Sequence, residues 1–285
     1  MSAQKIILVT GASGQVGSEL AVLAPAYPDF QFIFANRDLL ALDDAASVHH
    51  FFDTHTIFAC INCAAYTAVD KAESEKELAL QVNAVAPGLL AAACKKQGAW
   101  FIHFSTDYVF AGNADKPFTT NDATSPVNFY GSTKLKGEQA ALQANPDSII
   151  IRTSWVYSSF GKNFVKTMLR LMQEREQVGV VADQWGCPTY AADLARAVLQ
   201  IVQHPHPGIY HYCNEGIISW HQLATAIKEI TGSTCTVNAI ATSDYPTPAS
   251  RPAYSALDTQ KIKTQFGLHI PFWKDSLKNC LQLLQ

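Results

Sequence analysis

The sequence contains few charged residues and has little net charge. Asp, Glu, Lys and Arg make up 16% of its 285 residues, and the formal net charge is −3. Such a balance gives no general electrostatic attraction to nucleic acid or to anionic lipid surfaces, so we expect neither as a partner. No uninterrupted apolar run reaches the ~20 residues that a membrane-spanning helix requires. We therefore expect no association with a membrane.

The sequence also gives no indication of a secretory signal peptide or of a disulfide framework. The first residues lead directly into a predicted strand, which is not how a signal peptide begins. The seven cysteines are an odd number and stand mostly in apolar stretches, at positions 60, 63, 94, 187, 213, 235 and 280. We expect reduced thiols and a cytoplasmic protein.

Metal-ligand spacing of cysteines occurs in Cys60-Ile61-Asn62-Cys63. This tetrapeptide lies inside a predicted strand, and no second ligand pair follows it. Buried cysteines in such a strand act as small apolar side chains, so we favour core packing over a zinc or redox site. The sequence predicts no metal.

Apolar residues are abundant, at 48%, and 285 residues are enough to bury a large core. In the first half, short apolar runs alternate with helical patterns. These runs have the length and continuity of parallel strands that are covered on both faces. Their positions are 5–10, 32–35, 58–62, 100–105 and 148–152. The alternation predicts an α/β fold with a doubly wound parallel sheet.

A glycine-rich turn joins the first predicted strand to the first helix. It reads Gly11-Ala12-Ser13-Gly14-Gln15-Val16-Gly17. Glycines in this context allow a tight turn and close approach of the backbone to a pyrophosphate at the helix N-terminus. The spacing is Gly-x-x-Gly-x-x-Gly, and a purely structural turn is the alternative. We favour a dinucleotide site in a Rossmann-like domain.

The strict alternation of strand and helix ends near residue 153. We expect the Rossmann-like, dinucleotide-binding domain to span residues 1–152. Residues 153–285 then form mainly a smaller substrate-binding lobe, with some segments returning to the first domain. Arg170, Arg175 and Arg251 in this part could bind a diphosphate, although exposed arginines are common.

The end of the second predicted strand bears on the choice of nicotinamide. An acidic residue there binds the adenosine ribose hydroxyls and favours NAD. Here Asn36-Arg37-Asp38 follows the strand, and Arg37 could hold a 2′-phosphate, which mildly favours NADPH over NADH. A solvated arginine is the alternative, and the choice stays open.

A tyrosine and a lysine lie one helical turn apart in Tyr130-Gly131-Ser132-Thr133-Lys134. Free tyrosine has a pKa of about 10, and a nearby ammonium lowers that pKa, which makes Tyr130 a usable general acid. Thr106 ends the fourth predicted strand, where its hydroxyl can stabilise negative charge on a carbonyl oxygen. We predict Tyr130, Lys134 and Thr106 as catalytic residues, and an ordinary helical pair is the alternative.

With these features in order, the chain resembles the extended short-chain dehydrogenase/reductases and, among them, the dTDP-4-dehydrorhamnose reductase family. The similarity covers nearly the whole chain. It rests on residues 14–17, 67–73, 105–110, 152–157, 163–164, 183–184, 186, 188–189 and 251–252.

The resemblance implies reduction of the 4-keto group of a dTDP-linked deoxyhexose to dTDP-L-rhamnose, with NADPH or NADH as reductant. It implies that Tyr130 donates the proton and that Lys134 holds the nicotinamide ribose and lowers the pKa of Tyr130. Beside the loop glycines Gly11 and Gly17 and Arg37, the expected cofactor-binding residues are Gly14, Gln15, Val16, Asp43, Ala64, Ala65, Tyr66, Tyr130 and Lys134. The expected substrate-binding residues are Thr106, Asp107, Trp155 and Arg251.

One departure from the family concerns assembly. Some members dimerise through a metal held by carboxylates, and Glu19 matches one such position. Ala192, however, stands where a second carboxylate is expected. We expect a monomer or a homodimer without a bridging metal.

Two other functions stay open. Another sugar-nucleotide reductase or an epimerase would share the Tyr/Lys pair, whereas a dehydratase is disfavoured because Tyr108 stands where those enzymes carry a glutamate. A non-enzymatic, NADP-binding regulatory subunit is also similar in fold and motifs, as in the β subunit of methionine adenosyltransferase.

Overall fold

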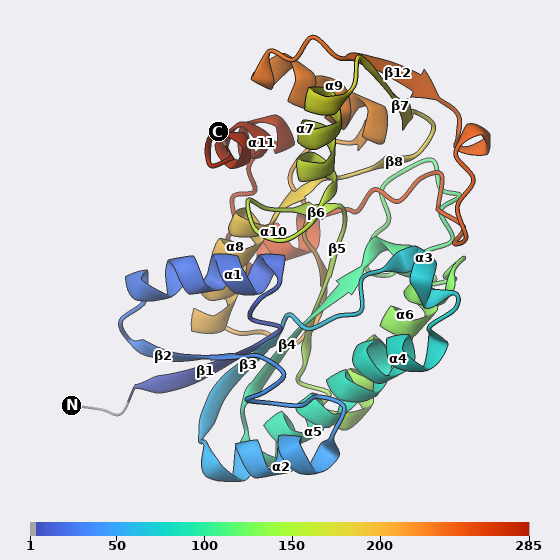
Figure 1. The fold of residues 1–285 in the computed structure, drawn as a ribbon. Coiled ribbons are helices and arrows are strands. Elements are labelled where there is room, and N and C mark those ends of the chain that lie inside the picture. Colours follow the sequence, from blue (N-terminus) through green and yellow to red (C-terminus); the bar gives the residue numbers. More distant parts are fainter. Residues whose placement is uncertain (1–3, 285) are drawn as a thin grey trace.

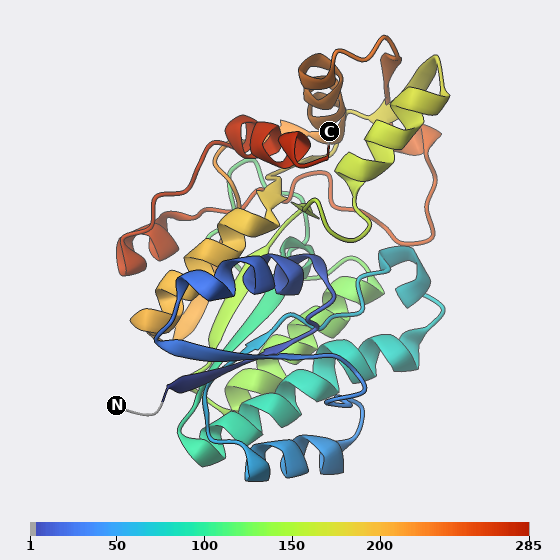
Figure 2. The same cartoon turned by 60° about the vertical axis from the view of Figure 1, so that its left-hand side comes forward.

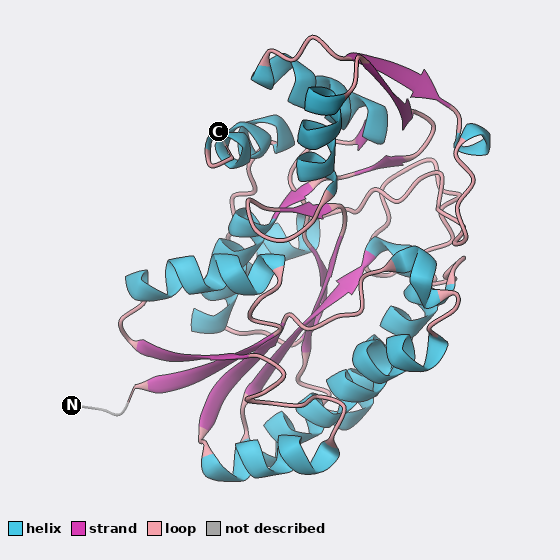
Figure 3. Ribbon diagram, in the orientation of Figure 1, coloured by secondary structure: helices cyan, strands magenta, loops and turns pink. Residues whose placement is uncertain are grey.

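A six-stranded parallel sheet forms the centre of the computed structural model, which describes residues 4–284 (Figures 1 and 3). The strand order is β2-β1-β3-β4-β5-β10, and every neighbouring pair is parallel. The strands are β1 (Lys5–Thr10), β2 (Phe30–Ala35), β3 (Ile57–Asn62), β4 (Trp100–Thr106), β5 (Ile149–Thr153) and β10 (Gly208–His211). The strand order reverses between β1 and β3, and ligands bind at such a reversal in doubly wound sheets.

Helices cover both faces of this sheet (Figure 2). One face carries α1 (Gln15–Leu23) and α8 (Ala191–Gln203), which pack against each other. The other carries α2 (Ala45–Thr54), α5 (Ala86–Gln97) and α6 (Phe129–Ala144). The predicted doubly wound α/β fold is confirmed.

Most residues of the central strands are buried, as their continuous apolar pattern predicted. Ile7, Leu8 and Val9 of β1 are each 0% exposed. Because successive side chains point to opposite faces, this strand contributes to the core beneath both helical layers. Local signals fix the helix ends: the Asn128 side chain accepts from Gly131 N at the start of α6, and Gly98 ends α5 with φ 69°.

A long helical run leads into the second layer through α3 (Val69–Ala72), α4 (Lys76–Leu80), the π-helical turn η2 (Gln81–Val85) and α5. Pro87 lies in the first turn of α5, where its missing N–H and fixed φ are tolerated. By length and composition, Lys76–Gln97 would be long enough and apolar enough to cross a membrane. Half of its most apolar window is buried inside the protein, as in a core helix of a soluble domain.

The chain beyond residue 153 builds a smaller lobe from short elements (Figure 1). Three two-stranded sheets form there, from six strands: β6 (Val156–Tyr157), β7 (Gln177–Val181), β8 (Trp185–Gly186), β9 (Thr189–Tyr190), β11 (Ile218–Ser219) and β12 (Thr236–Ile240). Its helices are α7 (Phe164–Glu174), α9 (Trp220–Thr231) and α11 (Trp273–Gln282).

Three elements of the second half return to the main sheet. Strand β10 pairs with β5 at its edge, and α8 covers the neighbouring face. Helix α10 (Gln260–Phe266) packs beside β10. The remaining short helical turns are η1 (Ala24–Ala26), η3 (Asp107–Val109) and η4 (Thr242–Asp244).

Candidate functional site

The glycine turn after β1 lies directly against the end of β3. Gly11 has φ 63°, and a Cβ there would stand 2.5 Å from the backbone nitrogen of Ala64. A Cβ on Gly17 would stand 2.5 Å from the carbonyl oxygen of Gly11, so both positions require glycine. This close packing of turn, helix and strand leaves the backbone of the turn open toward solvent at Gly14, which is exposed.

A cavity of about 360 Å³ opens at this point, where the strand order reverses. It brings together six of the predicted cofactor-binding residues, namely Gly11, Gly14, Arg37, Asp43, Ala64 and Ala65. Apolar side chains complete the walls: Leu40, Leu42, Leu78 and Val82. A slot with a glycine turn at one end, apolar walls and polar groups at the rim fits an adenine nucleotide.

Gln15, Val16 and Gly17 do not line this cavity. The Gln15 side chain is turned to the small lobe, where Oε1 accepts from Asn163 Nδ2 at 2.9 Å. Val16 packs against the core beneath the sheet. Through Gln15, the glycine turn is therefore connected to the start of α7.

Arg37 and Asp43 meet at the rim of the cavity. Arg37 Nη2 lies 2.5 Å from Asp43 Oδ2, and the two side chains are 78% and 38% exposed. An exposed ion pair of this kind contributes little to stability, so the guanidinium is free to exchange partners. The aspartate places a negative charge at the same rim.

Tyr66 is held by its neighbours beyond the cavity. Its backbone N–H donates to Asn83 Oδ1 at 2.8 Å, and its hydroxyl donates to Glu75 at 2.8 Å. Asn83 belongs to the π-helical turn η2 and also donates to Thr133 Oγ1 on α6 at 3.0 Å. The π turn thus links the end of β3 to the helix that carries Tyr130.

Tyr130 and Lys134 project from the first two turns of α6. A Cβ on Gly131 would stand 2.2 Å from the carbonyl oxygen of Tyr108, so this glycine lets α6 abut the turn that follows β4. The rings of Tyr108 and Tyr130 meet edge to face at 6.0 Å. Burial raises the pKa of Tyr130 to about 12, although a hydrogen bond with Thr106 acts in the opposite direction.

The raised pKa of Tyr130 differs from the lowering predicted from the Tyr/Lys spacing. The main cause of the raised pKa is burial of the phenol, and the Lys134 ammonium does not offset it because the Lys134 side chain is directed elsewhere. Its Nζ donates to the carbonyl oxygen of Phe104 at 2.7 Å and lies 3.5 Å from His103 Nε2, beneath the sheet edge. Lys134 is only 2% exposed, and burial lowers the pKa of its ammonium to about 8.

Thr106 and Asp107 lie at the end of β4, facing the same helix. Thr106 Oγ1 donates to Asp107 Oδ1 at 3.0 Å. Asp107 is 3% exposed, and burial raises the pKa of its carboxyl to about 6. Its Oδ2 has no hydrogen-bond partner among residues 4–284. A buried carboxylate oxygen without a partner is costly and is suited to accept from a ligand hydroxyl.

Arg251 reaches the site from the far end of the chain and is bound there by Asp70. The guanidinium makes two contacts, Nη1 to Oδ1 at 3.0 Å and Nη2 to Oδ2 at 2.8 Å. Asp70 also accepts from Ala249 N at 3.2 Å, and Asn128 donates to Ser250 O at 2.8 Å. These bonds dock the segment around Arg251 against α3 and the start of α6.

Trp155 follows β5 and has φ 47°, a left-handed conformation that is rare for a residue with a side chain. Its ring stacks on that of Trp220 with centroids 3.6 Å apart and an interplanar angle of 11°. A Cβ on Gly186 would stand 2.8 Å from the Trp155 ring. The strained backbone and the glycine fix the indole in one orientation at the base of the small lobe.

The other two arginines considered for a diphosphate lie on α7 or at its end. Arg170 pairs with Glu174 at 2.7 Å and is 60% exposed, and Arg175 is exposed as well. Glu19, the position compared with a metal ligand, accepts from Ser158 Oγ at 2.6 Å. Within residues 4–284 we find no group of three His, Cys, Asp or Glu side chains that could hold a metal ion.

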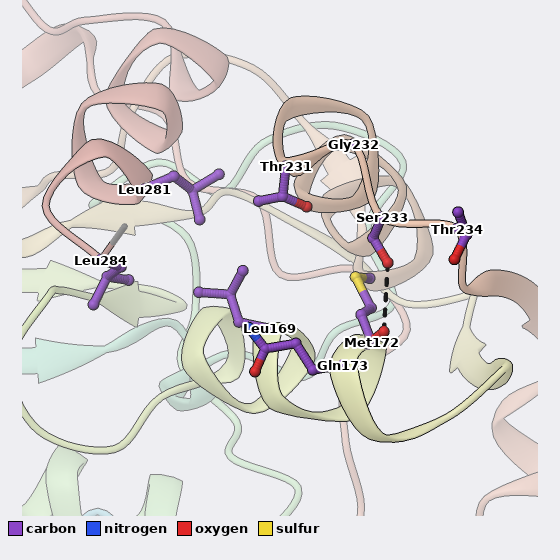
Figure 4. Close-up of a pocket in the computed structure, with 9 residues that line it drawn as sticks. All are labelled: Leu169, Met172, Gln173, Thr231, Gly232, Ser233, Thr234, Leu281 and Leu284. Atoms are coloured by element: carbon purple, nitrogen blue, oxygen red, sulfur yellow. Dashed lines mark hydrogen bonds between the residues drawn. The ribbon is translucent and has the colours of Figure 1, made fainter.

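A second, larger cavity of about 530 Å³ lies in the small lobe, away from these residues (Figure 4). Side chains from α7, α9 and α11 and from the turn after α9 line it, among them Leu169, Met172, Ser233 and Leu281. No titratable side chain lines it, so it offers no acid–base chemistry.

Sequence reasoning missed two polar residues of the site. His103 contacts Lys134 from within an apolar strand, and Asp70 binds Arg251 across 181 positions of the chain. A histidine in an otherwise apolar strand was a signal for the first. Only proximity in the fold reveals the second.

Comparison with known proteins agrees with the resemblance. The family model described as RmlD substrate binding domain matches residues 4–285. A dTDP-4-dehydrorhamnose reductase of Salmonella typhimurium is 42% identical, with 96% of each chain covered. The spore coat polysaccharide biosynthesis protein SpsK of Bacillus subtilis is 40% identical, over 97% of this chain and 96% of that protein.

Solved structures lead to the same family. A dTDP-4-dehydrorhamnose reductase of Clostridium acetobutylicum superposes with a TM-score of 0.95 at 40% identity, covering 98% of this chain and 99% of that one. The enzyme of Bacillus anthracis, in complex with NADP, has a TM-score of 0.95 at 34% identity, with 98% and 99% coverage. The predicted family is thus confirmed, and the chain belongs to the dTDP-4-dehydrorhamnose reductases.

Proposed function

We propose that this protein reduces the 4-keto group of dTDP-4-dehydro-L-rhamnose to dTDP-L-rhamnose, with NADPH or NADH as the hydride donor. One arrangement carries the proposal. A hydroxyl, a phenol and a buried lysine adjoin the end of β4, one strand away from the reversal of strand order; these groups belong to Thr106, Tyr130 and Lys134. Family membership supports the substrate class.

The cofactor would lie across the strand reversal. The backbone of the glycine turn and the start of α1 would bind its pyrophosphate, and the cavity bounded by Ala64, Ala65 and Asp43 would take the adenosine half. When bound, the nicotinamide supplies a hydride to the ketone carbon. Lys134 would hold the nicotinamide ribose.

Arg37 governs the preference between nicotinamides in this proposal. Its guanidinium would leave Asp43 to bind the 2′-phosphate of NADPH, whereas Asp43 itself would accept from a ribose hydroxyl of NADH. The exposed ion pair is weak enough for either exchange. We therefore assign both cofactors, with NADPH mildly preferred.

Tyr130 would supply the proton. With a pKa of about 12, its phenol is protonated at neutral pH, which is the form a reductase needs. As negative charge grows on the substrate oxygen, Tyr130 donates its proton and Thr106 stabilises the charge by a hydrogen bond.

The sugar nucleotide would bind between the end of β4 and the small lobe. The unpartnered Oδ2 of Asp107 would accept from a sugar hydroxyl, and Trp155 would offer its flat face to the ring. Arg251 would bind the diphosphate, and Asp70 would hold the Arg251 guanidinium in position. In this arrangement residues 1–152 bind the cofactor and residues 153–285 mainly the substrate.

Turnover with a defined substrate tests the proposal. Purified protein should oxidise NADPH or NADH with dTDP-4-dehydro-L-rhamnose and release dTDP-L-rhamnose, identified by mass and by chromatography against a standard. Other keto-sugar nucleotides serve as controls. Folded protein that binds NADPH but leaves this substrate unchanged would contradict the proposal.

Assembly and location are also part of the proposal. The low net charge of −3 favours a protein that acts without nucleic acid or membrane, and its free thiols favour the cytoplasm. Without a carboxylate at Ala192, we propose a monomer or a homodimer that needs no bridging metal. Light scattering with and without a chelator would test the latter statement.

A further inference from the structure

A chain of buried polar side chains crosses the centre of the sheet beneath Lys134. Thr10, Asn62 and His103 lie on one rung of the adjacent strands β1, β3 and β4. They are 2%, 1% and 0% exposed, and Lys134 is 2% exposed. Thr10 Oγ1 donates to Asn62 Oδ1 at 2.7 Å, Asn62 Nδ2 lies 3.0 Å from His103 Nδ1, and His103 Nε2 lies 3.5 Å from Lys134 Nζ.

The orientation of the Asn62 amide is fixed by a backbone group. The N–H of Ala64 is a donor under all conditions, and it lies 3.2 Å from Asn62 Oδ1. The atom that faces this N–H must therefore be the amide oxygen, which leaves the NH₂ group to face His103. Asn62 is a donor to His103, not an acceptor from it.

This orientation selects one tautomer of His103. Burial, followed by the nearby Lys134, holds the pKa of His103 well below its usual range, so the ring is neutral. A neutral imidazole has one N–H and one acceptor nitrogen. Because Nδ1 accepts from Asn62, the proton resides on Nε2, and the Nε2–H points to Lys134.

An N–H directed at the nitrogen of a lysine interacts differently with the protonated and the neutral form of that lysine. An ammonium carries three donors and no acceptor, whereas the amine has a lone pair. The other groups around Lys134 act differently: the Phe104 carbonyl accepts from either form, at 2.7 Å. Glu138 favours the ammonium, but its two oxygens bind Arg152 at 2.9 and 2.7 Å.

We propose that His103, held in a single tautomer by Asn62, is a positioning residue that presents an N–H to Lys134 and thereby favours the neutral amine of that lysine. The inference rests on the proposed function only for its consequence in catalysis. If Lys134 works beside the nicotinamide ribose and Tyr130, its charge then changes within the working pH range, and His103 sets where that change occurs.

Nuclear magnetic resonance tests the proposal without any substrate. In protein labelled with ¹⁵N-histidine, the His103 ring should show the Nε2–H tautomer. In protein labelled with ¹³C at the lysine ε-carbons, one signal should titrate near pH 8, and Lys134→Met should remove it. The reference for this signal is the ordinary pKa of a free lysine side chain, about 10.4.

Two variants change the proposed N–H in different ways. Asn62→Asp offers an acceptor to Nδ1, which reverses the tautomer, and should move the Lys134 titration up by about one pH unit or more. His103→Leu removes the N–H without adding charge and should move it upward by less. His211→Gln is the matched control, because His211 is also 0% exposed on a strand of the same sheet, and it should leave the titration unchanged.

The Nδ1–H tautomer at His103 in the unaltered protein would overturn the proposal, even if no variant folds. So would a Lys134 titration near 10.4, or a titration that stays in place in both folded variants. These readings need no keto sugar, so failure of the proposed reduction and failure of this inference are separate results. In an active enzyme, the alkaline limb of the kcat profile should shift with the titration.

Discussion

The sheet domain and the small lobe are built by different means. In the first, parallel strands with apolar runs form a six-stranded sheet, and helices cover both of its faces. In the second, four of the six strands are only two residues long, and helices α7, α9 and α11 supply most of the packing. The sheet domain therefore holds the proposed cofactor site on a rigid sheet, whereas the small lobe positions a few side chains on short connections.

The same difference separates what the sequence predicts from what it does not. Strands β1 to β5 were predicted within about two residues of their observed bounds, because continuous apolar runs mark them in the sequence. Strands β6, β8, β9, β11 and β12 were not predicted. Four of these have two residues, too few for a period to show.

The candidate site follows the same rule. The glycine turn, Thr106, Tyr130 and Lys134 could be predicted because each stands at the end of a strand or on one helix face. The direction of the Lys134 side chain could not, since it depends on His103 in another element. The ion pair of Arg251 with Asp70 likewise depends on contacts that no local pattern encodes.

The largest effect should follow from loss of Lys134, which belongs to the sheet domain and its proposed cofactor site. Lys134→Ala should lower kcat by about 100-fold or more and weaken NADPH binding, because the proposed contact with the ribose is lost. Steady-state kinetics and a fluorescence titration with NADPH measure the two effects. Lys136→Ala, an exposed neighbour on α6, is the control. Unchanged kcat in folded Lys134→Ala protein would remove this lysine from the mechanism.

The buried carboxyl of Asp107, once ionised, should lower the free energy of unfolding, so its effect depends on pH. Its pKa is about 6 in the folded protein, against an ordinary value of 3.8 for a free aspartate side chain. The folded state therefore binds the proton more tightly, so stability falls as the pH rises from about 4 to 6. Asp107→Asn should recover up to about 3 kcal/mol at pH 7 and much less at pH 4.

Thermal unfolding at both pH values measures the effect of Asp107→Asn. Asp115→Asn, at an exposed position, is the control. If Asp107 binds the substrate, the same variant should raise KM while it gains stability. Equal changes of Tm at pH 4 and pH 7 would show that the carboxyl does not titrate as described.

A substitution in the small lobe should weaken substrate binding and leave cofactor binding unchanged. Trp220→Leu removes the ring on which Trp155 stacks, a contact of about 0.5–1.5 kcal/mol. KM for the sugar nucleotide should rise by up to about tenfold, with the Kd of NADPH unchanged. Trp185→Ala, at an exposed tryptophan of the same lobe, is the control. A parallel loss of NADPH affinity would contradict this division of labour.

The smallest effect should appear at the rim of the cofactor cavity. Arg37→Ala should weaken NADPH binding by about threefold to tenfold, because the guanidinium is exposed and already paired with Asp43. The affinity for NADH should stay the same, as it should for both cofactors in Arg175→Ala. Titration with each nicotinamide decides the matter, and equal losses for NADH and NADPH would rule out a contact with the 2′-phosphate.

The proton donor is the central element of the account, and a single-turnover experiment tests it most directly. The complex with NADPH is mixed with dTDP-4-dehydro-L-rhamnose, and loss of the reduced nicotinamide is followed in wild-type and Tyr130→Phe protein. We expect the variant to bind both ligands but to transfer the hydride about 10²- to 10⁴-fold more slowly, because the phenol proton is missing in the transition state. Equal rates in the two proteins would contradict the account.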